Sequence, residues 1–213
     1  MELVFKILLI IHITAGSIGL FTGTMNIIRK KGDQLHKKVG VFFFYGMLIN
    51  GFSGLLMSLI HNNQFLLIIA VFSIYMASTG QRYLSLKQLN KGQKPQTIDW
   101  ILSSAMLIFG VGFLLFGGYL VFHKNYFGTV LLVFGMISVL MVLQDFKNYQ
   151  GKNPIKNFWL LVHIQRMIGG YIAATTAFLV VNNTILPSVV AWLLPTVILT
   201  PLILKWSRKY KIV

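Results

Sequence analysis

Long apolar stretches separated by short polar ones make up most of this chain. A helix crosses the roughly 30 Å hydrocarbon core of a membrane with about 20 apolar residues. Segments of this kind lie at residues 7–28, 39–60, 65–84, 100–122, 127–145, 158–181 and 188–206. Their apolar residues are continuous and lack the alternation of a barrel strand, so the backbone must be hydrogen-bonded within helices. The pattern predicts an all-α bundle of seven transmembrane helices, which forms one integral membrane domain over residues 1–213.

Composition excludes several other classes of protein. The chain is 56% hydrophobic and 11% charged, with a mean hydropathy of +0.74, which lies outside the range of soluble domains. It contains no cysteine, so disulfides, thiolate nucleophiles and cysteine-bound metals are all excluded. The formal charge of +15 comes from short basic clusters that flank apolar segments. We therefore expect no nucleic-acid partner, since that would require a basic face on a folded surface.

The basic residues predict how the chain is oriented in the membrane. Of the 19 lysines and arginines, all but Lys6, Lys124 and Arg166 lie within residues 29–38, 82–94, 147–156 and 205–211. These clusters follow the first, third, fifth and seventh apolar segments. Because positive charge accumulates on the cytoplasmic side, the N-terminus is expected outside and the C-terminus in the cytoplasm.

Two polar residues lie inside the first two apolar segments. His12 precedes Gly16 by four residues, and Asn50 lies four residues from both Gly46 and Gly54. Small residues at this spacing let helix backbones approach closely in lipid, and polar residues among them bond across the contact. We expect His12 and Asn50 to face neighbouring helices.

Arg166 is the one basic residue well inside an apolar segment, eight residues after residue 158. An arginine at the centre of a membrane helix costs roughly 3 kcal/mol, so it needs compensation. Helical side chains lean toward the N-terminus, which directs Arg166 and His163 toward the inner face. These two residues are one turn apart and can share a site.

The inner ends of other segments carry further candidates. Asp145 ends the fifth segment, where the negative end of the helix dipole disfavours an acid without a partner. Arg166 is the first candidate partner and Arg82 the second. His36 is flanked by cations that favour its neutral form, which can bind a metal or act as a base. Tyr83 and Tyr149 suit the aromatic belts at the membrane surface, as do Tyr119 and Trp159.

Several segments together resemble a known family. They are His12 with the glycines after it, Leu35-His36-Lys37-Lys38-Val39-Gly40, Phe72-Ser73-Ile74-Tyr75, Thr79-Gly80-Gln81-Arg82-Tyr83-Leu84, and His163 through Thr175-Thr176-Ala177-Phe178. In these the chain is similar to uncharacterised bacterial multi-pass membrane proteins with a domain of unknown function. The resemblance implies a location in the bacterial inner (cytoplasmic) membrane and implies no activity.

The polar residues near the inner face favour binding or sensing over catalysis. We expect a cytoplasm-facing polar pocket lined by His36, Gln81, Arg82, Asp145, His163, Gln165 and Arg166. Its positive surplus suits an anionic or amphipathic ligand such as a lipid head group or a quinone-like molecule. Membrane lipids are the expected partners. No residue is assigned a catalytic role, and the pattern indicates no oligomeric state.

Other functions remain open. A redox protein would use histidines to hold haem or a metal, with His36 and His163 as ligands and Asp145 as a possible third. A small-molecule transporter or an accessory membrane subunit is also compatible with the pattern. A zinc hydrolase of the membrane or a proton-coupled transporter would need an acid inside the membrane. The sequence places no acid within any predicted span, which argues against both.

Overall fold

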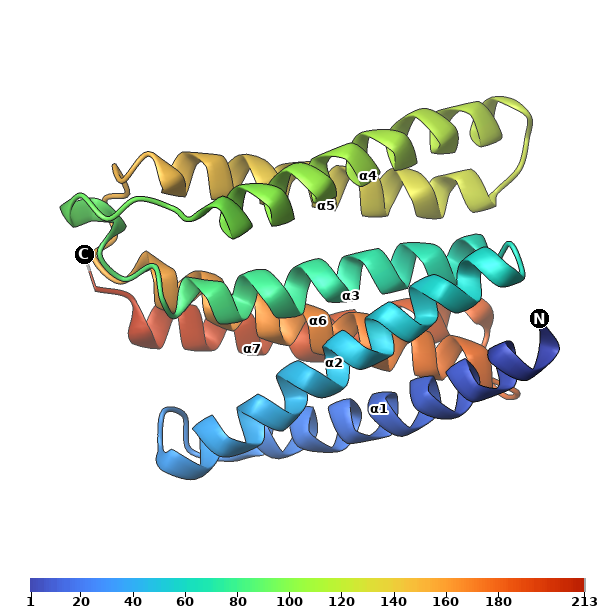
Figure 1. The fold of residues 1–213 in the computed structure, drawn as a ribbon, viewed down its shortest axis with the longest axis horizontal. Helices are drawn as coiled ribbons and strands as arrows, with labels where there is room; N and C mark the ends of the chain where they lie inside the picture. Colours follow the sequence, from blue (N-terminus) through green and yellow to red (C-terminus); the bar gives the residue numbers. More distant parts are fainter. Residues whose placement is uncertain (213) are drawn as a thin grey trace. The chain divides into compact units, whose positions relative to one another are not determined.

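Seven long helices make up the computed structural model, which describes residues 1–212. They are α1 (Glu2–Ile28), α2 (Gln34–Ile60), α3 (Gln64–Tyr83), α4 (Thr97–Phe122), α5 (Phe127–Tyr149), α6 (Phe158–Asn182) and α7 (Ser188–Tyr210), with a short 3-10 turn, η1 (Leu89–Lys91), before α4 (Figure 1). All seven are long and apolar enough to cross a membrane. The described residues contain no strand. The prediction of an all-α protein with seven membrane-spanning helices is confirmed.

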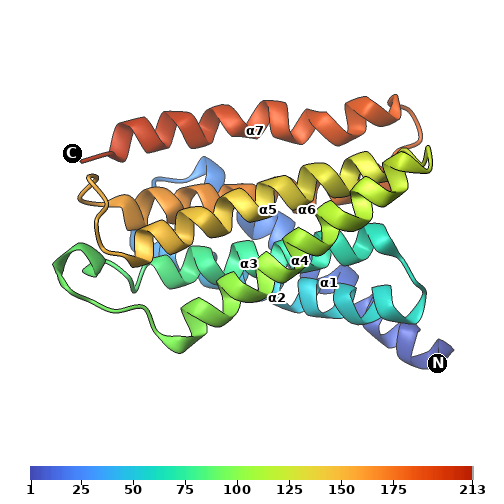
Figure 2. The same ribbon diagram turned by 90° about the horizontal axis from the view of Figure 1, so that it is seen from above.

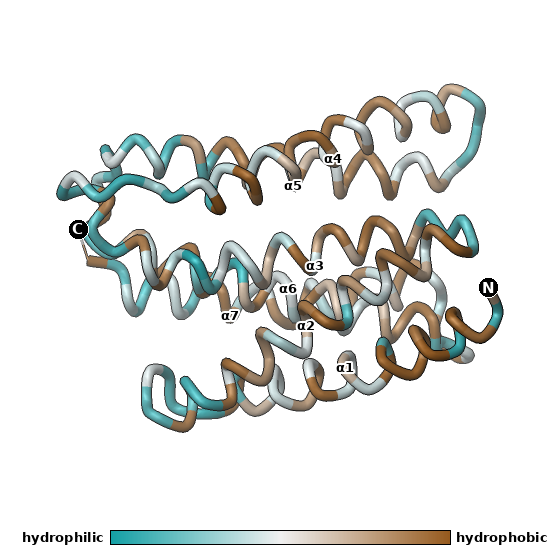
Figure 3. The backbone as a smooth tube through the Cα atoms, in the orientation of Figure 1, coloured by the Kyte–Doolittle hydropathy of each residue, from teal (hydrophilic) through white to brown (hydrophobic). Residues whose placement is uncertain are grey.

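Each helix is apolar along its middle, and hydrophilic residues gather at the helix ends and connections (Figure 3). Several helices continue past the predicted apolar segments into these polar ends. α2 begins at Gln34 and α5 ends at Tyr149. Hydropathy marks only the stretch that suits the hydrocarbon core, whereas a helix continues until a capping group or turn ends it. Asp145 therefore lies inside α5, about one turn before its end.

Contacts divide the chain into two compact units, which we describe separately. The first comprises residues 1–81 and 161–210 and is called the five-helix unit, because it contains α1, α2, α7 and most of α3 and α6. The second comprises residues 82–160 with the C-terminal residues from Lys211, and is called the two-helix unit after α4 and α5. That all seven helices form one domain stays a prediction.

In the five-helix unit, α1 and α2 form an antiparallel hairpin (Figure 1). A Cβ atom at Gly46 would lie 3.1 Å from both the Ala15 carbonyl oxygen and the Gly19 nitrogen, so the two backbones are in contact there. Elsewhere in this unit, Phe43 and Met47 of α2 pack with Ala77 of α3. Glycines thus allow the close approach, as expected for helices in lipid.

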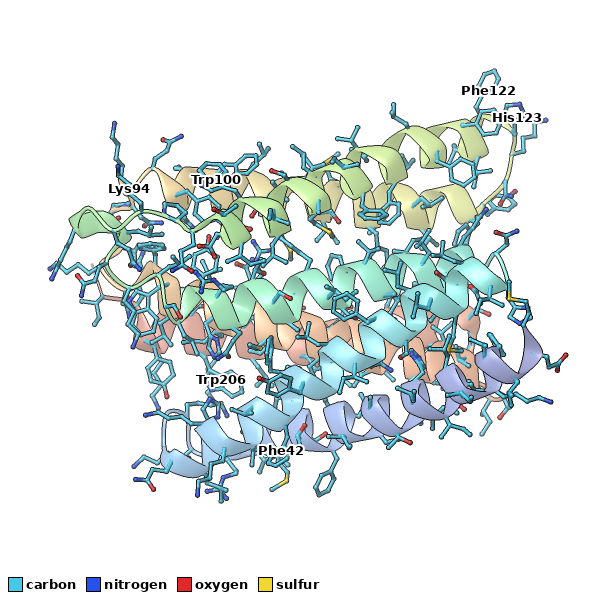
Figure 4. All side chains as sticks on the ribbon, in the orientation of Figure 1. Phe42, Lys94, Trp100, Phe122, His123 and Trp206 are labelled. Carbon is cyan, nitrogen blue, oxygen red and sulfur yellow. The ribbon has the colours of Figure 1, made fainter. Side chains whose placement is uncertain are left out.

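In the two-helix unit, α4 and α5 also form an antiparallel hairpin (Figure 2). A Cβ atom at Gly117 would lie 2.9 Å from the Gly128 carbonyl oxygen, and one at Gly135 would lie 2.9 Å from the Gly110 oxygen. Outward-facing side chains of both units are large and apolar: Phe42 is 62% exposed and Trp100 45% exposed (Figure 4). Such surfaces suit lipid as their solvent.

Candidate functional site

The candidate site lies at the end of the five-helix unit where α1, α3 and α7 finish and α2 and α6 begin, called here the basic end (Figure 1). Lys31 organises part of it. Its Nζ donates hydrogen bonds to the carbonyl oxygens of Asn26 and Ile27, both at 2.7 Å, and of Arg29, at 2.8 Å. The same ammonium lies 4.0 Å from the ring centroid of Trp206 in α7 (Figure 4). Burial lowers the pKa of Lys31. Lys31 therefore closes the C-terminal end of α1 and joins it to α7.

Asp33 sets the start of α2. Its carboxylate accepts a hydrogen bond from the backbone N–H of His36 at 2.6 Å and lies 3.3 Å from Nη2 of Arg29. The bond from this N–H lowers the pKa of the Asp33 carboxyl group. The sequence interpretation did not consider Asp33, although an aspartate just before an apolar run is a common N-cap. By starting α2 here, Asp33 places the partly exposed His36 ring in the first turn.

His163 on α6 is held in one orientation by α3. Its Nδ1 lies 2.8 Å from the carbonyl oxygen of Gly80. A carbonyl only accepts hydrogen bonds, so Nδ1 carries the proton and a neutral ring keeps the lone pair on Nε2. His163 is partly exposed, and His36 is near enough for a charge on one ring to act on the other. These two histidines of the expected site belong to the same end of the same unit.

Arg166 lies one turn further along α6 and is fully buried, at 0% exposed. Its guanidinium carbon lies 4.9 Å from the ring centroid of Tyr75 on α3. A Cβ atom at Gly80 would lie 3.0 Å from the Arg166 Cβ, so α3 and α6 are in close contact beside the arginine. The charge is thus inside the protein and away from lipid. Of the two expected glutamines, Gln165 is partly exposed and Gln81 is exposed.

Two other expected site residues belong to the two-helix unit. Arg82 Nε lies 2.7 Å from Asp99 Oδ1, and Nη2 lies 3.0 Å from Oδ2. Nη2 also donates to Gln96 Oε1 at 2.9 Å. Asp99 is 1% exposed and completes a capping box with Gln96 at the start of α4. Arg82 was the second candidate partner of Asp145; the structure pairs it with Asp99, because the capped carboxylate presents both oxygens to the guanidinium fork.

Asp145 is 0% exposed and accepts hydrogen bonds from two hydroxyl groups. Tyr83 Oη donates to Oδ1 at 2.8 Å, and Ser103 Oγ donates to Oδ2 at 3.2 Å. The network extends further: the Tyr149 hydroxyl lies 3.0 Å from Ser103 Oγ, and Asn148 Nδ2 donates to Tyr83 Oη at 3.1 Å. This is a polar cluster inside the helical part of the unit, where each hydroxyl meets another polar group.

One expectation about this region was wrong. Tyr83 and Tyr149 were placed in the aromatic belts, but they are 1% and 8% exposed and belong to the Asp145 network. Asp99 lies in the first turn of α4 and Asp145 about one turn before the end of α5, so the expectation that no acid lies within a span stays a prediction. The spacing of Asp145, Asn148 and Tyr149 by three and four residues was the signal in the sequence, since such residues share a helix face.

His12 and Asn50 bond each other across α1 and α2. His12 Nδ1 lies 2.9 Å from the Asn50 carbonyl oxygen, and Asn50 Nδ2 donates to the His12 carbonyl oxygen at 2.9 Å. Ser53 Oγ lies 3.3 Å from the same ring nitrogen. The pair lies close to Gly16 and Gly54, where added Cβ atoms would crowd the Asn50 and His12 side chains. These contacts give both residues a role in helix packing.

A metal centre of three protein ligands is not assembled within residues 1–212. This part of the chain has no group of three or more His, Asp or Glu side chains that could hold a metal ion. His36 and His163 belong to the five-helix unit and Asp145 to the two-helix unit, so a site that joins all three stays a prediction.

The seven apolar helices define a multi-pass membrane protein. Residues 9–117, a little over half of the chain, match the family model described as "Predicted membrane protein (DUF2306)". The chain belongs to this family of predicted membrane proteins. No curated protein and no solved structure matches the chain.

Proposed function

We propose that this protein binds or senses an anionic or amphipathic small ligand, such as a lipid head group or a quinone-like molecule, at the basic end of the five-helix unit. We further propose a bacterial inner-membrane location with the N-terminus outside and the basic end in the cytoplasm. The observation that carries the ligand proposal is the pairing of an oriented histidine with a buried arginine. His163 is fixed by Gly80 at 2.8 Å, and Arg166, one turn away, is 0% exposed.

The chemistry of these groups favours an anion. A cation kept inside a membrane helix costs roughly 3 kcal/mol, and such residues commonly serve a ligand or a partner group. The histidine Nε2 is an acceptor when neutral and a donor when protonated. Arg29, Lys30, Lys37 and Lys38 surround the start of α2. Each such cation near a membrane surface attracts an anionic group by about 1 kcal/mol.

A histidine-to-asparagine comparison tests the ligand site. His163→Asn keeps a side-chain N–H for the Gly80 carbonyl and removes Nε2. The probe is dihexanoyl phosphatidylglycerol, with dihexanoyl phosphatidylcholine as the neutral counterpart, titrated into purified protein by calorimetry. We expect the wild type to prefer the glycerol lipid and His163→Asn to weaken its binding about tenfold, a loss of about 1.4 kcal/mol.

The matched control is His123→Asn. His123 also has Nδ1 2.9 Å from a carbonyl oxygen, that of Tyr119, but it is exposed and lies in the connection after α4. It should leave binding unchanged. Two results would contradict the proposal. One is equal affinity of the wild type for the two lipids, and the other is an equal loss of phosphatidylglycerol affinity in His163→Asn and His123→Asn.

The same histidine also supports a second candidate, a redox protein that holds haem or a metal. A histidine that ligates a metal usually donates its other ring N–H to a carbonyl or carboxylate, as His163 does to Gly80. His36 is the nearby second imidazole. Elemental analysis and an absorption spectrum of gently extracted protein test this candidate. If the extracted protein contains no stoichiometric metal and shows no Soret band, this candidate is excluded.

The proposed orientation can be tested directly because the chain has no cysteine. Single cysteines replace Asn63, between α2 and α3, or Lys30, between α1 and α2. A maleimide that cannot cross membranes should label Asn63→Cys in intact spheroplasts and Lys30→Cys only after lysis. The reverse pattern would invert the proposed topology.

A further inference from the structure

The buried serine and threonine hydroxyl groups of residues 1–212 fall into two sets. Eight serines and threonines are buried. Six of them have hydrogen-bond partners: Thr22, Ser53, Ser58, Thr79, Ser103 and Ser138. Five of the six donate to a carbonyl oxygen three or four residues earlier in their own helix, and Ser103 donates to Asp145. This is how membrane helices commonly satisfy their hydroxyl groups.

Ser73 on α3 and Thr176 on α6 form the second set. They are 1% and 5% exposed, and their hydroxyl oxygens have no hydrogen-bond partner among the groups of residues 1–212. Neither hydroxyl bonds its own helix, although Thr79 and Thr175 in the same two helices do. A buried hydroxyl left without a partner is unfavourable. Both unusual hydroxyls belong to the five-helix unit.

The two residues lie on the faces through which α3 and α6 pack closely together. Ser73 precedes Met76 by three residues and Gly80 by seven, so these three share one face of α3. Thr176 follows Gly169 by seven residues. Contacts of Gly80 with Arg166 and of Gly169 with Met76 show that these faces meet. We call this contact the α3–α6 seam.

The seam offers donors in an apolar setting. Ile69, Ala70 and Phe72 around Ser73 are buried, as is Ala173 near Thr176. A buried water usually makes about three hydrogen bonds and needs polar partners on several sides. A carbonyl oxygen on an apolar molecule needs only one or two donors and brings its own apolar body. Met76, whose terminal methyl packs against Gly169, is an adaptable side chain that can make room for such a group.

We propose that the α3–α6 seam binds the carbonyl oxygen of an amphipathic membrane molecule through Ser73 and Thr176. The position is separate from the basic-end site. Along α3, Ser73 lies seven residues from Gly80, about 10 Å, and along α6, Thr176 lies ten residues from Arg166, about 15 Å, at 1.5 Å per residue. A quinone carbonyl and a lipid ester carbonyl present the same acceptor chemistry. The hydroxyls donate and the carbonyl accepts.

Two matched double variants test the proposal. The first, Ser73→Ala with Thr176→Val, removes the two unpartnered hydroxyls. The second, Thr79→Val with Thr175→Val, removes hydroxyls of the same helices that bond their own backbones at 2.6 Å and 2.8 Å. Delipidated protein is titrated with decylubiquinone in one arm and with dioleoyl phosphatidylglycerol in the other. Binding is followed by native mass spectrometry and by the melting temperature.

We expect one probe to bind the wild type and raise its melting temperature by several degrees, and that probe identifies the source of the carbonyl. The first double variant should bind it at least tenfold more weakly. The second double variant should bind it like the wild type. The first double variant should still prefer dihexanoyl phosphatidylglycerol over dihexanoyl phosphatidylcholine, so the seam and the basic-end site can each fail while the other holds.

Two results would overturn the proposal. One is equal probe binding by the wild type and the first double variant. The other combines two observations. Without probe, the first double variant melts at a lower temperature than the wild type, and neither probe changes the melting temperature of the wild type. In that case the hydroxyls hold a buried water. If they hold a ligand carbonyl, the probe-free first variant should melt at or slightly above the wild-type temperature, because it no longer buries unpartnered hydroxyls.

Discussion

The two units handle their buried polar groups in different ways. In the two-helix unit, polar side chains meet one another: Arg82 pairs with Asp99, and both oxygens of Asp145 accept hydroxyl groups. In the five-helix unit, His163 uses only one ring nitrogen on Gly80, and the hydroxyls of Ser73 and Thr176 bond no protein group of residues 1–212.

This difference separates polar groups that hold the fold from polar groups available to a ligand. A closed network stabilises one arrangement and is costly to break. A group with unused hydrogen-bonding capacity can be removed at little cost in stability but changes what the protein can bind. The five-helix unit is therefore the better place to look for function. Variants of the two units should therefore differ in how much stability they lose.

Arg82→Ala should destabilise the protein most. It leaves the Asp99 carboxylate, 1% exposed, without its ion pair. Removing one partner of a buried pair costs about 3 kcal/mol. The free energy of unfolding can be measured in mixed micelles with increasing SDS. Lys6→Ala breaks the Lys6–Glu2 pair, whose side chains are 65% and 84% exposed, and should change it by under about 0.5 kcal/mol. Similar small effects of both variants would show that the Arg82 pair does not hold the fold.

Ser103→Ala should have a moderate effect. Ser103 is 0% exposed and donates to Asp145, so its loss leaves one carboxylate oxygen with a donor fewer. The expected cost is about 1–3 kcal/mol in the same unfolding experiment. Ser104→Ala, at the exposed neighbouring position, is the control and should be close to neutral. Equal effects of the two substitutions would mean that the network is not closed as described.

Lys31→Met should cost about 1 kcal/mol. The substitution keeps the apolar length of the side chain and removes the ammonium that bonds three carbonyl oxygens at the end of α1 and lies over Trp206. Lys30→Met at the exposed neighbouring position should leave the melting temperature unchanged. Loss of near-ultraviolet dichroism from Trp206 would accompany the first variant alone. A neutral Lys31→Met would show that this polar contact, too, is dispensable in the five-helix unit.

His163→Asn should change stability least, by under about 1 kcal/mol, because asparagine keeps a donor for the Gly80 carbonyl. Its effect should appear in ligand binding. Melting curves of the probe-free protein check this prediction. A loss of stability as large as that of Arg82→Ala would contradict the difference between the two units. His163 would then stabilise the fold as much as the ion pair of the two-helix unit does.

Much of the fold could be predicted from the sequence because a membrane helix depends mainly on local composition. Each predicted segment corresponds to one helix, and the differences are at the ends, where α2 begins at Gln34 and α5 continues to Tyr149. Hydropathy locates the apolar middle, but caps such as Asp33 and turns determine where the helix stops. The correct placement of Arg166 inside the protein followed from the cost of exposing a guanidinium to lipid.

Seven helices apolar enough to cross a membrane, and the clusters of charge between them, could be predicted because both follow from residues that are neighbours along the chain. The folded structure was needed to show that Arg82 meets Asp99, that Tyr83 and Ser103 bond Asp145, and that Ser73 and Thr176 bond no group of residues 1–212. Such partners come from different helices. Their choice depends on the rotation and register of each helix against the next, which small residues at the contacts set and no local pattern records.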